Sequence, residues 1–304
     1  MKNIKYIPNK SNSTHIHSVN EVDYITFDKL DKAGVVHAFS TRTGGVSEGY
    51  LGSMNLSFHR GDDPDKVMEN HRRFAKAVGY DHTKLVFSDQ VHKTDIYKVT
   101  EADAGKGIVR ISDIIGIDGL MTNVPGIPLM TFYADCVPIY FYDPVRKVVA
   151  MNHSGWKGTV AKISQCMIKR LGDEYGKKKK ISQCMIKRLG DEYGTDPTDL
   201  ICAIGPSICK DCYEVSEDVA EQFKLAYTEQ EAREIVYPRE SQYKGKYLLD
   251  LHTANYFNLV DAGVKPENID VTNICTCCNP DWLFSHRASK GLRGNLGAVI
   301  MLPE

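Results

Sequence analysis

Residues 134–158 read ADCVPIYFYDPVRKVVAMNHSGWKG and place a cysteine and a histidine at opposite ends of an apolar segment. Pro144 is favoured in a type I turn, so the residues around it are predicted to form two antiparallel strands. If the turn is centred between Pro144 and Val145, Cys136 lies directly opposite His153 on one face of the sheet. A loop one residue longer or shorter would put the two side chains on opposite faces.

Three interpretations of this pair are open. A cysteine and a histidine can bind Zn²⁺ together with a third protein ligand, which leaves one position for water. Alternatively, His153 activates Cys136 as a nucleophile. The third interpretation is structural, with Cys136 as a small buried side chain and His153 as a hydrogen-bonded residue at a strand end. Gly155 and Gly158 flank Trp156, which favours a functional role modestly, because a ligand can approach such a loop closely.

The composition is that of a globular protein with a large core, since 42% of the 304 residues are hydrophobic. Lysine and arginine number 38 and aspartate and glutamate 39, a balance that favours a small neutral ligand over nucleic acid or a membrane surface. No apolar run approaches the roughly 20 residues of a membrane span, and no signal peptide is evident, so we expect a cytoplasmic protein. The odd count of nine cysteines indicates reduced thiols or metal ligands.

Strand and helix patterns are interspersed along the chain, which predicts an α/β fold with a mixed sheet and helices on its faces. One helix is expected to begin at Asp63 and Pro64, because an N-cap aspartate and an N1 proline precede apolar residues at helical spacing. Further helices are expected at 159–175, 216–227 and 250–261. Strands are expected at 35–40, 84–89, 94–100, 200–205, 269–274 and 296–302.

The sequence ISQCMIKRLGDEYG occurs twice without a change, at residues 163–176 and 181–194, with KKKK between the copies. Solenoid repeats diverge and need three or more units, so this pair indicates a local duplication. We expect a helical surface insertion around 163–194, broken between the copies, with only one copy docked in the native place.

Two CxxC pairs, Cys209 with Cys212 and Cys275 with Cys278, together suit a structural zinc site. The pairs stand more than 60 residues apart, much farther than in a zinc ribbon. The separation therefore favours scattered reduced thiols over a shared zinc site.

Several long motifs occur in an order that resembles the YfiH-like laccase-domain family. They are FSTRTGG (39–45), NLSFHRGDDPDKVMENH (55–71), DQVHKTD (89–95), DGLMT (118–122), ADCVPI (134–139), NHSGWKGT (152–159), AIGPSI and CYEVSEDV (203–219) and FSHRASKGLRGNLGAV (284–299). The resemblance implies one α/β domain at 21–304, after a polar N-terminal extension at 1–20. That domain would be a mixed β-sheet sandwich with flanking helices, the CNF/YfiH-like type of fold found in certain cysteine hydrolases.

The resemblance also implies a metal site made of His92, Cys136 and His153, which would be the catalytic residues. Spacing alone does not select His92 from ten histidines. Lys157 stands where an arginine is common in the family, and Cys209 where a glycine is usual. Lysine keeps the charge but loses the planar fork with which arginine binds anions.

Members of the family are described as polyphenol oxidases and as purine nucleoside phosphorylases. Multicopper oxidases use many His-x-His pairs, whereas this chain has one, His15-Ile16-His17, which argues against a four-copper site. A His₂Cys site with one open position suits Zn²⁺, with Cu²⁺ as the alternative ion.

We therefore expect a zinc-dependent phosphorylase of adenosine, inosine and S-methyl-5′-thioadenosine that also deaminates adenosine. Its partners would be a nucleoside and phosphate, with no nucleic acid and no membrane. Arg42 in the STRTGG loop and then Lys157 are the candidates to bind the anion. The alternatives are a copper-dependent polyphenol oxidase, a Cys136–His153 hydrolase of cell-wall precursor amides, and a metal-stabilised binding protein without activity.

Overall fold

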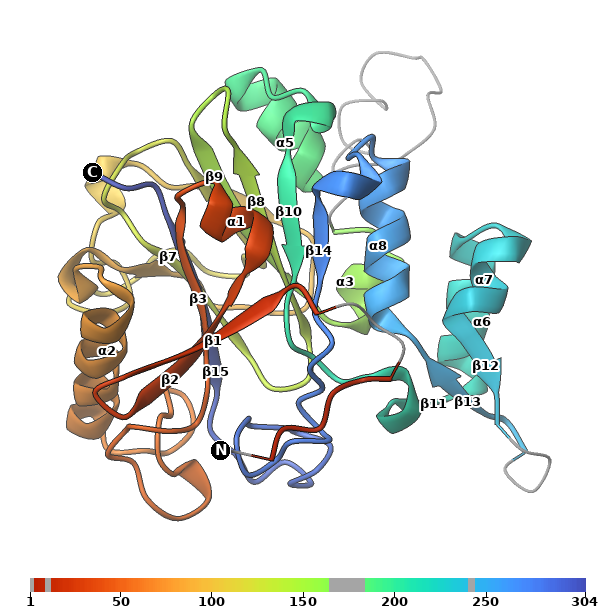
Figure 1. Cartoon of the computed structure of the whole chain (residues 1–304), viewed down its shortest axis with the longest axis horizontal. Helices are drawn as coiled ribbons and strands as arrows, with labels where there is room; N and C mark the ends of the chain where they lie inside the picture. The colour runs from red at the N-terminus through yellow and green to blue at the C-terminus, as the bar shows by residue number, and fades with distance from the viewer. Residues whose placement is uncertain (1–2, 9–11, 164–183, 240–243) are drawn as a thin grey trace.

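The computed structural model describes residues 3–8, 12–163, 184–239 and 244–304 (Figure 1). Two six-stranded sheets and one three-stranded sheet form its β structure. The α/β class expected from the sequence is thereby confirmed.

The first sheet has the order β1-β2-β3-β15-β7-β4, and all of its pairs are antiparallel except β4 with β7. Its strands are β1 (Thr14–Val19), β2 (Val22–Phe27), β3 (Val36–Ser40), β4 (Val86–Phe87), β7 (Leu129–Tyr133) and β15 (Leu296–Met301).

The second sheet is mixed and has the order β14-β10-β8-β9-β6-β5, with parallel pairs at both edges. Its strands are β5 (Ile96–Lys98), β6 (Gly119–Thr122), β8 (Val137–Asp143), β9 (Val148–Ser154), β10 (Ile201–Ile204) and β14 (Ile269–Val271). The third sheet, β11-β13-β12, consists of β11 (Glu214–Ser216), β12 (Val236–Pro238) and β13 (Lys246–Leu249).

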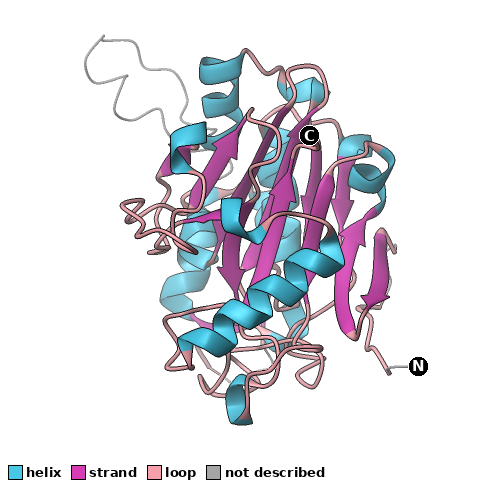
Figure 2. Ribbon diagram, turned by 90° about the vertical axis from the view of Figure 1, so that its left-hand side faces the viewer, coloured by secondary structure: helices cyan, strands magenta, loops and turns pink. Residues whose placement is uncertain are grey.

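The helices lie outside the two large sheets (Figures 1 and 2). The α-helices are α1 (Asp28–Lys32), α2 (Pro64–Val78), α3 (Trp156–Val160), α5 (Cys184–Tyr193), α6 (Glu217–Ala226), α7 (Glu229–Ile235) and α8 (Leu251–Asp261). Short 3₁₀ turns are η1 (Gly49–Leu51), η2 (His82–Lys84), η3 (Glu101–Asp103), η4 (Pro197–Asp199), η5 (Lys210–Cys212) and η6 (Pro266–Asn268).

Strand β8 shows why the molecule is layered, because both of its faces are apolar. Val137, Ile139 and Phe141 join the core beneath α5 and α8, while Tyr140 and Tyr142 join the core shared by the two large sheets. A strand buried on both faces reads as a continuous apolar run, as this one does. On the far side, α2 lies across the first sheet (Figure 2). The result is a four-layer sandwich of helix, sheet, sheet and helices.

The expected helix starts at 63 and 250 are confirmed with their capping chemistry. The Asp63 side chain accepts a hydrogen bond from the N–H of Asp65, and α2 ends at Gly79 in the left-handed conformation. Asp250 caps α8 in the same way, by accepting from the N–H of Thr253.

The central hairpin differs from the expected register. Its loop occupies residues 144–147, so the turn centre moves by one residue, and His153 pairs with Pro138. Cys136 therefore lies diagonal to His153 and not directly opposite. The residue that pairs with His153 is Pro138 and not Cys136, which is a shift of two positions along the chain. Because side chains on one face of a strand recur every two residues, Cys136 and His153 still share the face toward the first sheet.

The N-terminal segment also differs from expectation, since Thr14–Val19 form an edge strand of the first sheet and do not lie in a free extension. Asn20 and Glu21 both have positive φ, and they join β1 to β2 as a two-residue hairpin turn. Only Thr14 of this edge strand is buried, so the strand lacks the apolar face that would mark it in the sequence. Before this strand, the N–H of Ile7 donates to the carbonyl of Asn273, so this part of the segment is also joined to the rest of the fold. The domain boundary between residues 20 and 21 stays a prediction.

The second copy of the duplicated sequence forms α5, and its Met185, Ile186 and Leu189 are buried in the core over the second sheet. One copy is thus docked, as expected. The first copy falls almost entirely at 164–183, outside the described residues, so the expectation that it is undocked stays a prediction. Within the part of the chain that the structure describes, no helix is long and apolar enough to cross a membrane.

Candidate metal centre

The structure brings His92, Cys136 and His153 together. One ligand atom from each lies within 4.8 Å of the others. The Nε2 atom of His92 is 3.8 Å from the Cys136 sulfur, and the two imidazole rings lie edge to face at 4.7 Å. All three residues expected from the family resemblance therefore meet at one point.

Different elements supply the three side chains at the end of the seam between the large sheets. His153 is near the end of β9 and contacts the ring of Tyr133 from β7. Cys136 immediately precedes β8, and His92 lies on the loop between β4 and β5. His153 is buried, Cys136 half-buried and His92 exposed, so the cluster opens to solvent on the His92 side.

Asp118 holds this arrangement in place. Its buried carboxylate accepts hydrogen bonds from the backbone N–H groups of Val91, His92 and Lys93 at 3.1, 3.0 and 2.8 Å. It also lies 2.8 Å from Nδ1 of His153, which leaves Nε2 of that ring free for a metal. One carboxylate thus positions two of the three ligands and stabilises the loop in which His92 has a positive φ of 60°.

The electrostatics favour a thiolate at Cys136. Burial by itself raises the pKa of this thiol, but the neighbouring His153 and His92 outweigh burial and lower the pKa to about 6. For His153, burial lowers the pKa, yet the Cys136 thiolate and the Asp118 carboxylate raise it to about 9. A cation bound between the ligands would take the place of the proton on His153.

The donor set fits a zinc ion. Zinc binds sulfur at about 2.3 Å and nitrogen at about 2.0 Å in a tetrahedron, which requires ligand atoms separated by about 3.5 Å. The His92–Cys136 distance of 3.8 Å is close to this value. Two imidazoles and one thiolate leave the fourth position open, as in catalytic zinc sites.

Gly155 leaves room for the cluster. A Cβ atom at this position would lie 2.9 Å from Cδ2 of His92 and 3.1 Å from the Cys136 sulfur. We expect Gly155→Ala to lower metal affinity by roughly tenfold or more, because displaced ligands cannot close on the ion. Gly158→Ala is the control, because its Cβ would meet only ordinary contacts at 3.5 Å. Titration with a zinc-competing dye measures both, and equal affinity in the two variants would contradict this steric role.

Two cavities meet at His92 and Cys136. The first, of about 330 Å³, is largely apolar. It is lined by Val91, His92, Asp135, Cys136, Trp156, Lys157, Ile208, Tyr213 and Leu251. Aromatic side chains beside a metal cluster are suited to stacking against a flat heterocycle.

The second cavity, of about 250 Å³, is cationic and also reaches His153. Arg60 and Arg293 lie on its wall and share the Oδ1 atom of Asn295 as hydrogen-bond acceptor. Burial and the charge of Arg60 lower the pKa of Arg293 to about 10. The buried Nε of Arg293 has no hydrogen-bond partner among the described residues, and the Asp89 carboxylate also lines this cavity. An anion would satisfy this pair.

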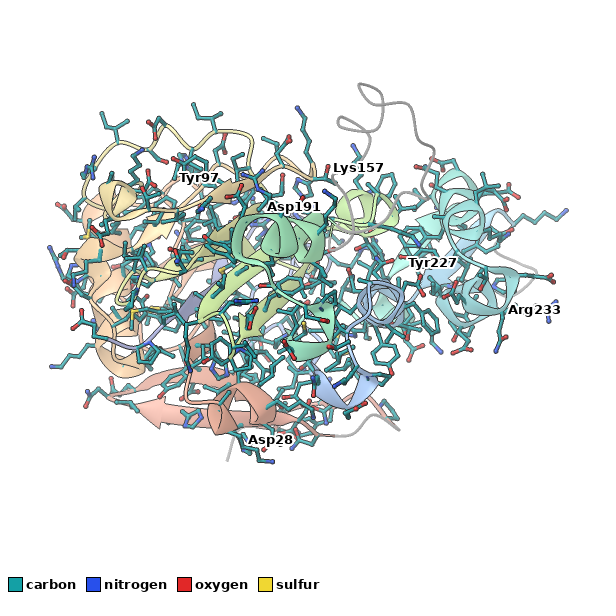
Figure 3. The ribbon with its side chains drawn as sticks, turned by 90° about the horizontal axis from the view of Figure 1, so that it is seen from above. Asp28, Tyr97, Lys157, Asp191, Tyr227 and Arg233 are labelled. Carbon is teal, nitrogen blue, oxygen red and sulfur yellow. The ribbon has the colours of Figure 1, made fainter. Side chains whose placement is uncertain are left out.

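The two anion-binding candidates from the sequence lie elsewhere. The Arg42 guanidinium donates to the carbonyls of Gly52 and Pro280 and packs over the ring of Phe284, and it lines neither cavity. Lys157 lies on α3, exposed at the rim of the aromatic cavity (Figure 3). The structure therefore gives Arg42 a packing role and assigns the cationic wall to other arginines.

Sequence reasoning missed Asp118, Arg60 and Arg293. Each lies inside a motif that carried the family resemblance, at DGLMT, FHRGDD and GLRGN, but nothing in their spacing points to the cluster. Only the fold brings these loops to one end of the sandwich.

A His₂Cys cluster at the seam of an α/β sandwich, between an aromatic and a cationic cavity, defines a candidate metalloenzyme. A family model described as multi-copper polyphenol oxidoreductase laccase matches residues 36–180 and 172–303. The chain belongs to this family. The two matches overlap within the duplicated segment.

Curated relatives support the same assignment. Purine nucleoside phosphorylase YlmD of Bacillus subtilis is 32% identical over 271 residues, 89% of each chain. A purine nucleoside phosphorylase of Deinococcus radiodurans is 34% identical over 270 residues, 89% of this chain and 90% of the relative.

Solved structures agree on the fold. The crystal structure of YlmD from Geobacillus stearothermophilus matches with a TM-score of 0.82 and 32% identity, covering 97% of this chain and all of that one. The hypothetical protein YfiH from Bacillus licheniformis matches with a TM-score of 0.81 and 30% identity, covering 94% and 98%. The YfiH-like resemblance and the sandwich fold are confirmed.

Proposed function

We propose that this chain is a zinc-dependent purine nucleoside phosphorylase that acts at His92, Cys136 and His153. The observation that carries the proposal is the meeting of an aromatic and a cationic cavity at one metal-binding cluster. The relatives named purine nucleoside phosphorylases support it. Substrates would be adenosine, inosine and S-methyl-5′-thioadenosine.

The aromatic cavity would hold the nucleoside. Trp156 and Tyr213 offer flat apolar surfaces for a purine, and the volume is within the usual range for small-molecule sites. Lys157 at the rim would contact polar groups of the substrate. Its flexible single charge suits such a peripheral contact better than a bidentate one.

The cationic cavity would hold phosphate. Arg60 and Arg293 would bind its oxygens and orient one of them toward C1′ of the sugar. The new C1′–O bond forms as the C1′–N9 bond breaks, and the phosphate proton ends on the purine. The products are the free base and ribose 1-phosphate, or its 5-methylthio derivative when S-methyl-5′-thioadenosine is the substrate. Zinc, when bound, would supply a Lewis acid that stabilises developing negative charge.

Adenosine deamination is proposed as a second activity of the same cluster. Water replaces the amino group at C6, so adenosine and water yield inosine and ammonia. The open metal position suits this reaction, because zinc sites of this kind activate water. The purine must bind with C6 toward His92 in this mode. Incubation of adenosine without phosphate should therefore give inosine, and its absence would limit the enzyme to phosphorolysis.

Arg293→Ala is expected to raise KM for phosphate by roughly 10- to 100-fold, because it removes a charge-assisted contact to the anion. KM for inosine should change little. Arg233→Ala is the control, since Arg233 is exposed on α7 (Figure 3), forms an ion pair with Glu229 and lines neither cavity. Steady-state kinetics with varied phosphate measures both. An unchanged phosphate KM in Arg293→Ala would exclude this cavity as the phosphate site.

A copper-dependent polyphenol oxidase is the second candidate, because the family model carries that description. Across the described residues, His92 and His153 are the only histidines in a candidate metal cluster, which leaves no multinuclear arrangement. Oxygen consumption with a phenol by copper-loaded protein, together with no nucleoside turnover, would favour the oxidase.

A further inference from the structure

Four cysteines form a second cluster that the proposed reaction does not use. Cys209 and Cys212 follow β10, with Cys209 just before η5 and Cys212 at its last residue. Cys275 and Cys278 follow β14. All four sulfur atoms lie within 4.8 Å of one another. All four thiols are free.

The topology explains how two distant CxxC pairs meet. Strands β10 and β14 are parallel neighbours, so their carboxyl ends lie at the same edge of the sheet. A bridge between Ser207 and Cys275 and the hydrogen bond from the Thr276 N–H to the Ser207 carbonyl extend this pairing into the loops. The long separation in sequence is therefore no obstacle to a shared site.

The sulfur positions fit a single metal ion. The sulfur of Cys278 lies 3.4 Å from that of Cys212 and 3.9 Å from that of Cys209. A disulfide requires about 2.05 Å, whereas four sulfurs around zinc at about 2.3 Å in a tetrahedron are separated by about 3.8 Å.

Backbone N–H groups favour a negative charge on the sulfur of Cys275. The N–H groups of Cys209 and Cys278 both point at the Cys275 sulfur, at 3.2 and 3.4 Å. Such donors stabilise a thiolate. Four thiolates this close repel one another unless a cation lies between them.

We propose that Cys209, Cys212, Cys275 and Cys278 bind a structural zinc ion with four sulfur ligands. A closed set of four protein ligands leaves no position for substrate, which is the mark of a structural site. A tetrahedral set of four sulfur ligands is typical of zinc or iron and not of calcium, which takes oxygen ligands.

This second site would stiffen the wall of the aromatic cavity. Ile208, next to Cys209, donates its N–H to the carbonyl of Asp135 at 3.0 Å. Thr276, next to Cys275, donates its hydroxyl to the Asp135 carboxylate at 2.6 Å. Asp135 has a positive φ of 89° and immediately precedes Cys136. The zinc-bound loops would therefore hold the backbone that presents the Cys136 ligand.

The test is the zinc content of protein purified without added metal, measured by elemental mass spectrometry. The wild type should hold two zinc ions per chain, and Cys278→Ser and Cys136→Ala one each. Cys277→Ser is the matched control, because Cys277 lies in the same loop but outside the cluster, and it should keep two. One zinc in the wild type that Cys136→Ala removes would overturn this proposal and leave the catalytic one intact. If the wild type holds one zinc ion that only Cys278→Ser removes, the four-cysteine site stands and the proposed zinc site at Cys136 is wrong.

A second measurement does not depend on the folding of Cys278→Ser. Wild-type protein loaded with Co²⁺ should show sulfur-to-metal absorption of a four-thiolate site, and Cys136→Ala should retain that absorption. Iron in place of zinc, a mass lower by the hydrogens of two disulfides, or no such absorption would overturn the assignment. Chelation of the wild type should also lower its Tm, since structural zinc stabilises the folded state.

Discussion

Cys136→Ala is expected to lower kcat/KM for inosine phosphorolysis by roughly 10²–10³-fold or more, with the fold intact. The variant loses the only sulfur ligand of the cluster and the charge that favours a cation there. Removal of one electrostatic contact to a transition state typically costs that much. Hypoxanthine release, followed by coupled oxidation, measures the effect.

Two controls separate ligand loss from other causes. Cys277→Ser should retain full activity, because its thiol belongs to neither cluster. A chelator should abolish wild-type activity, and added zinc should restore it. If alkylation of Cys136 abolishes an amidase activity that chelators leave intact, the protein is instead a Cys136–His153 hydrolase, in which Asp118 would orient the histidine.

Asp118→Asn is expected to have the second largest effect. The change removes the charge that receives three backbone N–H groups, and an amide cannot accept all of these and His153 as well. Loss of such a ligand-orienting group typically lowers metal affinity by about 10- to 100-fold. Weakening of these buried charged hydrogen bonds should also cost about 2 kcal/mol of stability or more.

Zinc titration and denaturant unfolding measure the two effects separately. Asp113→Asn is the control, because its exposed carboxylate contacts Lys106 and no ligand. It should change neither quantity. Wild-type zinc affinity in Asp118→Asn would show that the carboxylate does not position the ligands, even if stability falls.

The central hairpin was predictable because its two strands are apolar runs, buried on both faces, and its turn residues are distinctive. The predicted turn centre was one residue too early, yet Cys136 and His153 still share a face. The error moved the residue paired with His153 by two positions, from Cys136 to Pro138. Because side chains on one face recur every two residues along a strand, this shift did not change the face. An error of one position would have lost the site.

His92 and Asp118 were beyond such reasoning. His92 lies on an irregular loop, where no periodicity connects it to a strand 61 positions later. Its conformation depends on the Asp118 carboxylate, a tertiary contact that leaves no local signal. The family resemblance supplied His92 without that physical reason.

The four-cysteine cluster also depends on a tertiary arrangement that the sequence does not display. The two CxxC pairs were visible in the sequence, but their separation argued against a shared site. That argument fails because β10 and β14 are neighbours in the sheet, although α6, α7 and α8 lie between them in the chain. Strand order, which the sequence does not display, decides whether the two pairs meet.

Incubation of zinc-loaded wild-type protein with inosine and phosphate is the most direct test of the proposed activity at the His92–Cys136–His153 cluster. Phosphorus NMR measures ribose 1-phosphate, and chromatography measures hypoxanthine. The expected result is ribose 1-phosphate and hypoxanthine in equal amounts, with neither formed when phosphate is omitted. A folded, zinc-loaded protein that leaves both inosine and adenosine unchanged in the presence of phosphate would contradict the proposed function.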